Sequence, residues 1–204
     1  MRNHPERQLL AAAKDTPLAA PIRFALYTGV RQGELLGLSW DDIDFTAATV
    51  TIRRSARYFT GQGMKMTPGK TARARRTVEL SPPALALLKR HRQEQRVRRL
   101  RLGGSWQMNQ LVFPSSVGTV WLPHNFYREY RKIVGRTGLT DPKSVVFHTL
   151  RHTAATQWLK AGAELHTVSR RLGHRSASFT SDTYLHLLAG MQRTAARAMD
   201  HLLA

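Results

Sequence analysis

Residues 148–162 read HTLRHTAATQWLKAG, a stretch that predicts an α-helix ending at Gly162. On a helix, His148, Arg151 and His152 lie close together, because residues three and four positions apart are neighbours on its surface. The N-terminus of such a helix also presents backbone N–H groups and the positive end of its dipole, which favours a bound phosphate. Taken singly, however, these residues are more simply explained as partly buried histidines and a solvated arginine on a basic helix. The rest of the chain must decide between the two interpretations.

The surrounding sequence predicts a mainly α-helical chain with one small sheet. Further helices are expected at 5–15, 18–30, 32–40, 81–102, 122–138, 163–174, 178–188 and 190–204. Strands are expected at 48–55, 64–66 and 75–80, and the residues DDIDF (41–45) are expected to turn the chain. We therefore expect an α+β fold, with a small antiparallel three-stranded sheet at one edge and no linker dividing residues 1–204.

Composition narrows the class of protein. The 204 residues suit one domain, or at most two small ones. The chain has no cysteine, which excludes disulfides, thiol catalysis and cysteine-ligated zinc. It contains no run of 18 apolar residues, and its N-terminus has no long apolar segment typical of a secretory signal. A cytosolic protein that does not span a membrane is the default expectation.

Charge gives the first functional indication. Lys and Arg number 32 and Asp and Glu 13, which leaves a formal net charge of +19. Such self-repulsion destabilises a compact domain unless a polyanion neutralises it, and nucleic acid is the commonest polyanion. A solvated basic surface or a protein bound to a membrane surface are the alternatives.

Two upstream segments carry candidate phosphate-binding residues. Arg31 lies in TGVRQGE between two glycines that let the backbone approach a ligand, and its planar guanidinium suits phosphate oxygens. Glu34 is placed to hold Arg31, although a surface arginine at a helix start is the simpler explanation. Lys70, in TPGKTARARRT, can reach a substrate from a hairpin and donate a proton. The alternative is that this basic hairpin only contacts the DNA backbone.

Backbone contact suits the neighbouring arginines better than it suits Lys70. These candidate DNA-binding residues are Arg73, Arg75 and Arg76.

Tyr184, in FTSDTYLH, is the candidate nucleophile. A tyrosine on a helix is usually a core residue with its hydroxyl at the rim. As a nucleophile its phenol needs activation, because its unperturbed pKa is about 10. Two arginines directed at one phosphate supply the electrostatic stabilisation that phosphoryl transfer requires, and histidines can transfer protons.

Together these motifs resemble the tyrosine recombinases, also called the phage integrase family. The segments TGVRQGELLGLSWDDID, GKTARARRTVEL, HTLRHTAATQWLKAG, LGH and SDTYLH follow one another in the order and spacing of that family. The resemblance covers residues from about 8 to 204, nearly the whole chain. Each motif is weak alone, but five in series make chance agreement a poor explanation.

The resemblance implies a role for each matched residue. Arg31 and Arg151 would bind the scissile phosphate, and Lys70 would protonate the leaving 5′ oxygen. His148 would act as general base or proton relay, and His174 would donate a hydrogen bond to a phosphate oxygen.

Tyr184 would attack the phosphorus and form a 3′-phosphotyrosyl link, so that no metal, ATP or other cofactor is needed. Glu34 and His152 would support these groups. Gly69 stands where proline is common in the family, so the hairpin before Lys70 departs from the family pattern.

The resemblance also implies an assembly and a setting. Double-stranded DNA is the expected partner, with a homotetramer on DNA and a monomer when free. Residues 1–204 would form a single catalytic domain without the N-terminal DNA-clamping domain, and would therefore bind DNA weakly. A cytoplasmic, nucleoid-associated protein of a bacterium or phage is expected.

Three alternatives remain at this stage: a type IB topoisomerase-like enzyme, a DNA-binding module without chemistry, and a metal nuclease built on DDID (41–44). Two further segments can each be interpreted in two ways. The basic face of the helix at 89–101 either contacts a DNA backbone or is solvated. The helix at 190–204 packs either on a neighbouring protomer or on its own core.

Overall fold

The computed structural model describes residues 4–69, 75–107 and 109–174. Lys70, Arg73, Tyr184 and the helices expected at 178–188 and 190–204 lie outside the described residues. Among the described helices, none combines the length and the apolar character needed to cross a membrane.

Seven α-helices are described, and most begin and end close to the positions expected from the sequence. They are α1 (Pro5–Ala12), α2 (Ala19–Thr28), α3 (Gln32–Leu36), α4 (Pro82–Leu102), α5 (Pro123–Val134), α6 (Phe147–Lys160) and α7 (Leu165–Leu172). Short 3-10 turns, η1 (Trp40–Asp42) and η3 (Gly103–Ser105), follow α3 and α4. Local signals place these ends well: Pro82 opens α4 after Ser81, and Gly29 and Gly173 end α2 and α7 in the left-handed conformation.

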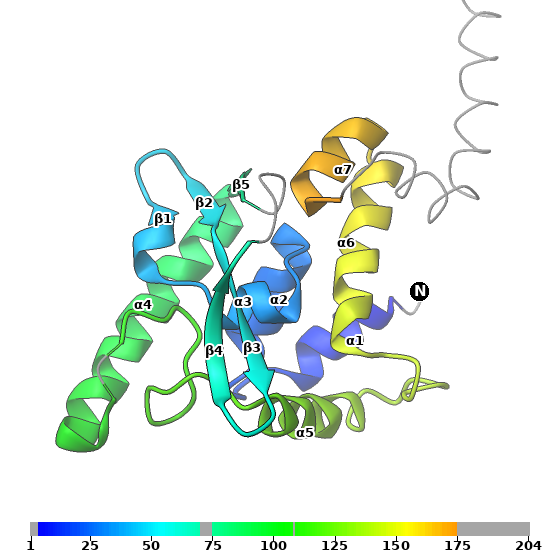
Figure 1. Ribbon diagram of the computed structural model, residues 1–204. Helices are drawn as coiled ribbons and strands as arrows, with labels where there is room; N and C mark the ends of the chain where they lie inside the picture. The colour runs from blue at the N-terminus through cyan, green and yellow to red at the C-terminus, as the bar shows by residue number, and fades with distance from the viewer. Residues whose placement is uncertain (1–3, 70–74, 108, 175–204) are drawn as a thin grey trace, which may run out of the picture.

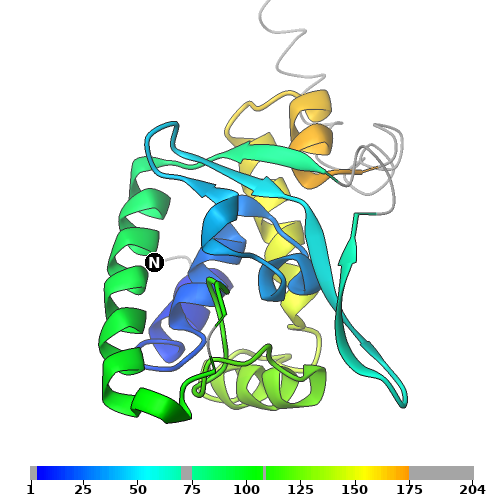
Figure 2. The ribbon, with the colours of Figure 1, turned by 60° about the vertical axis from the view of Figure 1, so that its left-hand side comes forward.

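The strands form two small sheets, where the sequence predicted one. β1 (Ile43–Asp44), β2 (Thr49–Ile52) and β5 (Arg76–Glu79) make an antiparallel sheet in the order β1-β2-β5. β3 (Arg54–Phe59) and β4 (Gly63–Pro68) pair separately as an antiparallel hairpin (Figure 2). The fold class, with a small antiparallel sheet, is as expected, but the strands of that sheet are not all the ones predicted. The strand predicted at 64–66 lies in β4 of the separate hairpin, and β1, in the turn predicted at 41–45, is the third strand of the sheet. The strand predicted at 48–55 is divided at Arg53.

The division at Arg53 follows the change in burial along the chain. Val50 and Ile52 are buried in the core, whereas Tyr58 and Phe59 of β3 are exposed. Asp42 fixes the bend, because its buried carboxylate accepts a hydrogen bond from Arg54 at 2.9 Å. One strand pattern in the sequence therefore yields a core strand followed by a strand of an exposed hairpin.

Helix α2 lies at the centre of the molecule, between α4 on one side and α6 on the other (Figures 1 and 2). Its Ile22, Phe24 and Ala25 are completely buried, which explains the almost continuous apolar sequence of this helix. A smaller apolar cluster between α6 and α7 contains Leu159 and Leu172. Helix α7 packs on α6 and on β5, which brings the end of α7 close to the start of α3.

Candidate active site

Arg151 joins three segments of the chain at one place. Its Nη1 donates to the carbonyl of Gly29 at 2.6 Å, and its Nη2 donates to the carbonyl of Leu172 at 2.7 Å. These contacts tie α6 to the turn after α2 and to the end of α7. The residue is only 3% exposed, so its positive charge is buried.

Arg31 approaches the same place from the start of α3. Its Nη1 donates to Glu34 Oε1 at 2.9 Å, and its Nη2 lies 3.4 Å from the carbonyl of Gly173. Arg31 and Arg151 thus contact the carbonyls of two consecutive residues, Gly173 and Leu172. The side chain of Arg31 is 41% exposed, which leaves part of this side chain open to a ligand. The expectation that Glu34 holds Arg31 agrees with this geometry.

Arg76 differs from its expected role as a DNA contact. Its side chain is 6% exposed, and it forms a two-point ion pair with Glu34, at 2.9 Å and 2.8 Å. Neighbouring Arg75 is exposed, because successive side chains along an extended chain point to opposite faces. For Arg76 the sequence-based expectation is therefore corrected: it is a buried partner of Glu34, whereas Arg75 remains a candidate DNA contact.

The carboxyl of Glu34 is strongly stabilised in its charged form. Burial alone would raise its pKa, but the hydrogen bonds and charge of Arg76, followed by those of Arg31, lower the pKa to about 2. Glu34 is therefore a fixed negative charge between two guanidiniums at any pH near neutrality.

Three histidines border the two arginines. The rings of His148 and His152, both exposed on α6, meet edge to face with centroids 4.8 Å apart. Burial, then the neighbouring charges of His152 and Arg151, lower the pKa of His148, and burial and Arg151 lower that of His152. His174 follows the end of α7, where burial first, and then the charges of Arg151 and Arg31, lower its pKa to about 4. The histidines are consequently neutral near pH 7, in a cationic environment that suits an anion.

The structure thus brings together the described members of the site predicted from the sequence. These are Arg31, Glu34, His148, Arg151, His152 and His174. Lys70 and Tyr184 remain sequence-based predictions, since both lie outside the described residues.

Arg171 is a structural residue that the sequence analysis missed. Its Nη2 donates to the carbonyl of Glu79 at 2.8 Å, and its guanidinium lies 4.8 Å from the centre of the Trp158 ring. These contacts attach α7 to β5 and α6. The sequence offered only a weak signal, a second arginine beside Arg170 before the helix-ending Gly173.

The acidic segment 41–44 has a structural use. The buried carboxylate of Asp42 bonds the backbone N–H of Ser39 and the side chain of Arg54, and Asp44 accepts the N–H groups of a turn. Asp42 is thus engaged within the protein, which argues against the metal-nuclease alternative.

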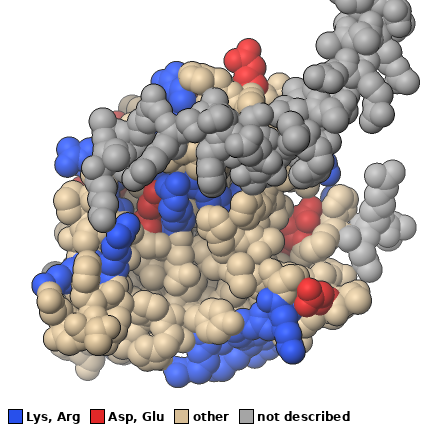
Figure 3. Space-filling model, turned by 45° about the vertical axis from the view of Figure 1, so that its right-hand side comes forward, with Lys and Arg blue, Asp and Glu red and all other residues tan. Residues whose placement is uncertain are grey.

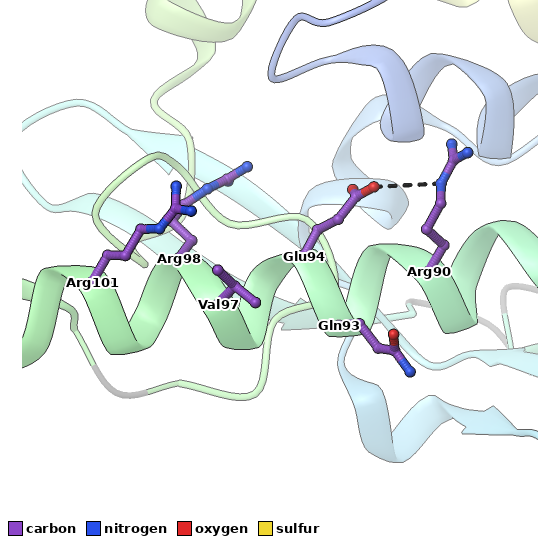
Figure 4. Close-up of a pocket in the computed structure, with 6 residues that line it drawn as sticks. All are labelled: Arg90, Gln93, Glu94, Val97, Arg98 and Arg101. Carbon is purple, nitrogen blue, oxygen red and sulfur yellow. Dashed lines mark ion pairs between the residues drawn. The ribbon is translucent and has the colours of Figure 1, made fainter.

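A separate groove lies along α4 (Figure 4). Helix α4 lies across α2 from α6, which carries Arg151, His148 and His152 (Figures 1 and 2). It has a volume of about 460 Å³, and Arg90 and Glu94 form an ion pair at 3.4 Å on its wall. Figure 3 shows that Lys and Arg side chains lie in several separate groups on the face it displays. Positive charge on this face is therefore not confined to a single patch.

The sequence of this chain matches the family model described as phage integrase family, over residues 1–191. The chain belongs to this family. It is 33% identical to a XerC-like tyrosine recombinase of Caldanaerobacter subterraneus subsp. tengcongensis, over 96% of this chain and 52% of that protein. It is 28% identical to an integrase of Streptomyces ambofaciens, over 94% of this chain and 50% of that protein. The chain thus spans about half the length of these relatives.

Solved structures of an integrase and of a recombinase share the fold. The Tn1549 transposon integrase, in complex with transposon right end DNA, superposes with a TM-score of 0.78 at 20% identity, over 96% of this chain and 65% of the other. The XerA recombinase superposes with a TM-score of 0.68 at 26% identity, over 95% and 64%. The resemblance and the fold class predicted from the sequence are confirmed.

Proposed function

We propose that this chain contains the catalytic centre of a site-specific DNA recombinase that cleaves and rejoins DNA through a 3′-phosphotyrosyl intermediate. One observation carries the proposal: Arg31 and Arg151, from distant parts of the sequence, contact the consecutive carbonyls of Gly173 and Leu172 beside His174. Guanidiniums fixed in this way stabilise the charge that develops on a phosphate in the transition state.

In the proposed reaction, the phenol oxygen of Tyr184 attacks the phosphorus, and the bond from phosphorus to the 5′ oxygen breaks. His148 accepts the phenol proton, which its neutral state at pH 7 allows. Lys70 donates a proton to the departing 5′ oxygen. The exposed part of Arg31 binds a phosphate oxygen, His174 donates a hydrogen bond to another, and Arg151 adds positive charge from beneath.

Rejoining reverses these steps with a new 5′ hydroxyl. The phosphodiester energy is retained in the protein–DNA ester, so the proposed reaction uses neither ATP nor a metal ion.

Covalent capture on nicked DNA tests the proposal. The chain is incubated with labelled nicked duplexes of randomised sequence, in which cleavage releases a short strand and prevents rejoining, and adducts are resolved under denaturing conditions. Wild-type protein should form an adduct, with or without EDTA, and peptide mapping should place it on Tyr184. Tyr184→Phe should form none, whereas Tyr127→Phe, which changes an exposed tyrosine of α5, should match wild type. An adduct that survives in Tyr184→Phe would refute the assignment.

The alternatives give different results in the same system. A topoisomerase-like enzyme would relax supercoiled plasmids of any sequence, and a DNA-binding module would bind DNA without an adduct. The family relatives named above are a recombinase and an integrase, which favours site-specific recombination.

We further propose that the protein works on double-stranded DNA in the bacterial cytoplasm, associated with the nucleoid, as a monomer when free and as a homotetramer on paired sites. Sedimentation of the protein alone and with the duplexes selected by covalent capture tests this. A stable tetramer without DNA, or a single copy on paired sites, would contradict it.

A further inference from the structure

The carboxylate of Glu34 is shared between two arginines. Its Oε1 accepts Arg31 Nη1 at 2.9 Å and Arg76 Nη1 at 2.9 Å. Its Oε2 accepts the backbone N–H of Arg31 at 2.9 Å and Arg76 Nη2 at 2.8 Å. The two-point contact from Arg76 fixes the plane of the carboxylate, and the carboxylate in turn fixes both the backbone and the side chain of Arg31.

Arg76 also reaches the opposite side of the site. Its Nε donates to the carbonyl of Arg171 at 2.8 Å, in the last turn of α7, three residues before His174. Each of the three guanidinium nitrogens of Arg76 therefore donates to the protein, and the side chain is 6% exposed. Arg76 is placed to act through other residues, not by touching DNA.

We propose that Arg76 is a positioning residue for the recombination chemistry: it couples Glu34, and hence Arg31, to the end of α7, and hence His174. The inference rests on the proposed function, because it assumes that Arg31 and His174 face one phosphate.

Charge gives Arg76 a second effect on the site. With Arg76 present, one carboxylate lies between two guanidiniums, so the group keeps a positive charge. Without it, Glu34 would balance Arg31 one to one and weaken the attraction of Arg31 for a phosphate. The charge of Arg76 also contributes to the low pKa of His174, after burial and the charges of Arg151 and Arg31.

Two substitutions separate geometry from charge. Arg76→Lys keeps the positive charge but loses the planar fork and the contact with Arg171, because an ammonium is a point donor. Arg76→Gln loses the positive charge as well as the planar fork. Single-turnover cleavage of the nicked duplex pool at saturating protein measures the geometric effect, and NMR titration of the His174 ring measures the effect of charge.

In Arg76→Lys, the cleavage rate should fall roughly 100-fold, the order expected when a reacting group is misplaced by about 1 Å. DNA affinity and the His174 pKa should stay close to wild type in that variant. In Arg76→Gln, cleavage should fall at least as far, and the His174 pKa should rise.

Arg54→Lys is the control for a lost planar fork, because Arg54 also donates to a buried carboxylate, that of Asp42 at 2.9 Å. This variant should leave the cleavage rate and the His174 pKa unchanged. All cleavage rates are measured at a temperature well below the midpoint of thermal unfolding of each variant. Wild-type cleavage by folded Arg76→Lys, or an equal loss in Arg54→Lys, would overturn the inference.

If the proposed function is wrong, the wild-type protein forms no covalent adduct with DNA, which distinguishes this outcome from failure of the inference about Arg76. The NMR titration then still tests the coupling, and an unchanged His174 pKa in Arg76→Gln overturns it.

Discussion

Arg31 and Arg151 are the same residue type in opposite surroundings. The side chain of Arg31 is 41% exposed, whereas Arg151 is 3% exposed and donates to two backbone carbonyls. Substitutions at the two positions should therefore act differently. Loss of Arg31 removes a group open to ligand, and loss of Arg151 also removes a connection between α6, α7 and the end of α2.

Arg151→Met should destabilise the fold. The carbonyls of Gly29 and Leu172 would lose their donors, and a buried acceptor left unpaired costs about 1–3 kcal/mol. We expect the free energy of unfolding in urea to fall by about 3 kcal/mol. Arg96→Met, which removes an exposed arginine of α4, should change it by less than about 0.5 kcal/mol. Equal stability of the two variants would contradict the structural role of Arg151.

Stability should fall as the solution is acidified from pH 6.5 towards pH 4. The pKa of His174 is about 4 in the folded protein against 6.5 for the unperturbed group, because of burial and nearby cationic groups. Between these values the unfolded chain binds more protons than the folded one, so stability is fully present above pH 6.5 and is lost as the pH falls to about 4. The charged groups that lower the His174 pKa are Arg151, Arg31, Arg76 and, once protonated, His152.

Urea unfolding across this pH range, in wild type and His174→Gln, measures the effect. The variant should show a shallower slope, while lowered pKa values at His148, His152 and His91 leave it a residual slope of the same sign. An unchanged slope would show that the His174 ring is not held neutral by the fold.

The burial of Arg75 and Arg76 could not be predicted from the sequence. Arg75 and Arg76 were predicted together as DNA contacts, yet one is exposed and the other is buried against Glu34. The strand period implies that adjacent residues face opposite sides. Which side is the interior depends on where α3 packs, and the sequence does not state this.

At the scale of elements, the turn between α2 and α3 is packed directly under α7. Gly29 has a φ of +65°, and a Cβ placed there would lie 2.7 Å from Leu172 Cδ2 and 3.0 Å from Trp158 Cη2. A glycine is thus required both by backbone conformation and by the approach of α6 and α7.

Gly29→Ala should destabilise the protein more than Gly162→Ala. Gly162 also has a positive φ, +87°, but nothing lies within 4 Å of its virtual Cβ, so it isolates the conformational cost. That cost is about 1–2 kcal/mol for a residue other than glycine, and the clash at Gly29 adds to it. Urea unfolding of the two variants measures the difference. Similar losses would mean that α7 yields to the methyl group without cost.

Sheet pairing was the least predictable feature of the elements. The alternation in 48–55 indicated a strand, but not its division at Arg53 into β2 and β3. The pairing of β2 with β5 is a non-local choice, because the β3–β4 hairpin lies between these two strands in the sequence. Helix ends were easier to predict, since glycine and proline act within one turn.

At the scale of the whole molecule, the net charge of +19 should make DNA binding strongly dependent on salt. A protein that neutralises roughly 6–10 phosphates loses about 10³–10⁵ in affinity between about 50 and 200 mM salt. Arg75→Gln should flatten the log–log slope by about 0.9, the value for one lost phosphate contact. Arg101→Gln should leave it unchanged, because α4 lies across α2 from the site.

Fluorescence anisotropy with a labelled duplex at several salt concentrations measures both slopes. If Arg101→Gln flattens the slope as much as Arg75→Gln, then DNA extends onto α4 and the basic face of 89–101 is a backbone contact. If neither variant changes the slope, Arg75 does not face DNA.

The sequence by itself determined the helices among the described residues, the fold class and the family, because caps, apolar periodicity and motif spacing are local patterns. It also indicated that Arg31, His148, Arg151 and His174 belong to one site. Only the tertiary structure decided how that site is built: Arg151 is buried, Arg31 is partly exposed, and Arg76 is buried between Glu34 and α7. The burial and the ion pairs of a residue arise when distant segments pack together. The sequence around an arginine in a basic chain therefore does not show whether its side chain will be buried or exposed.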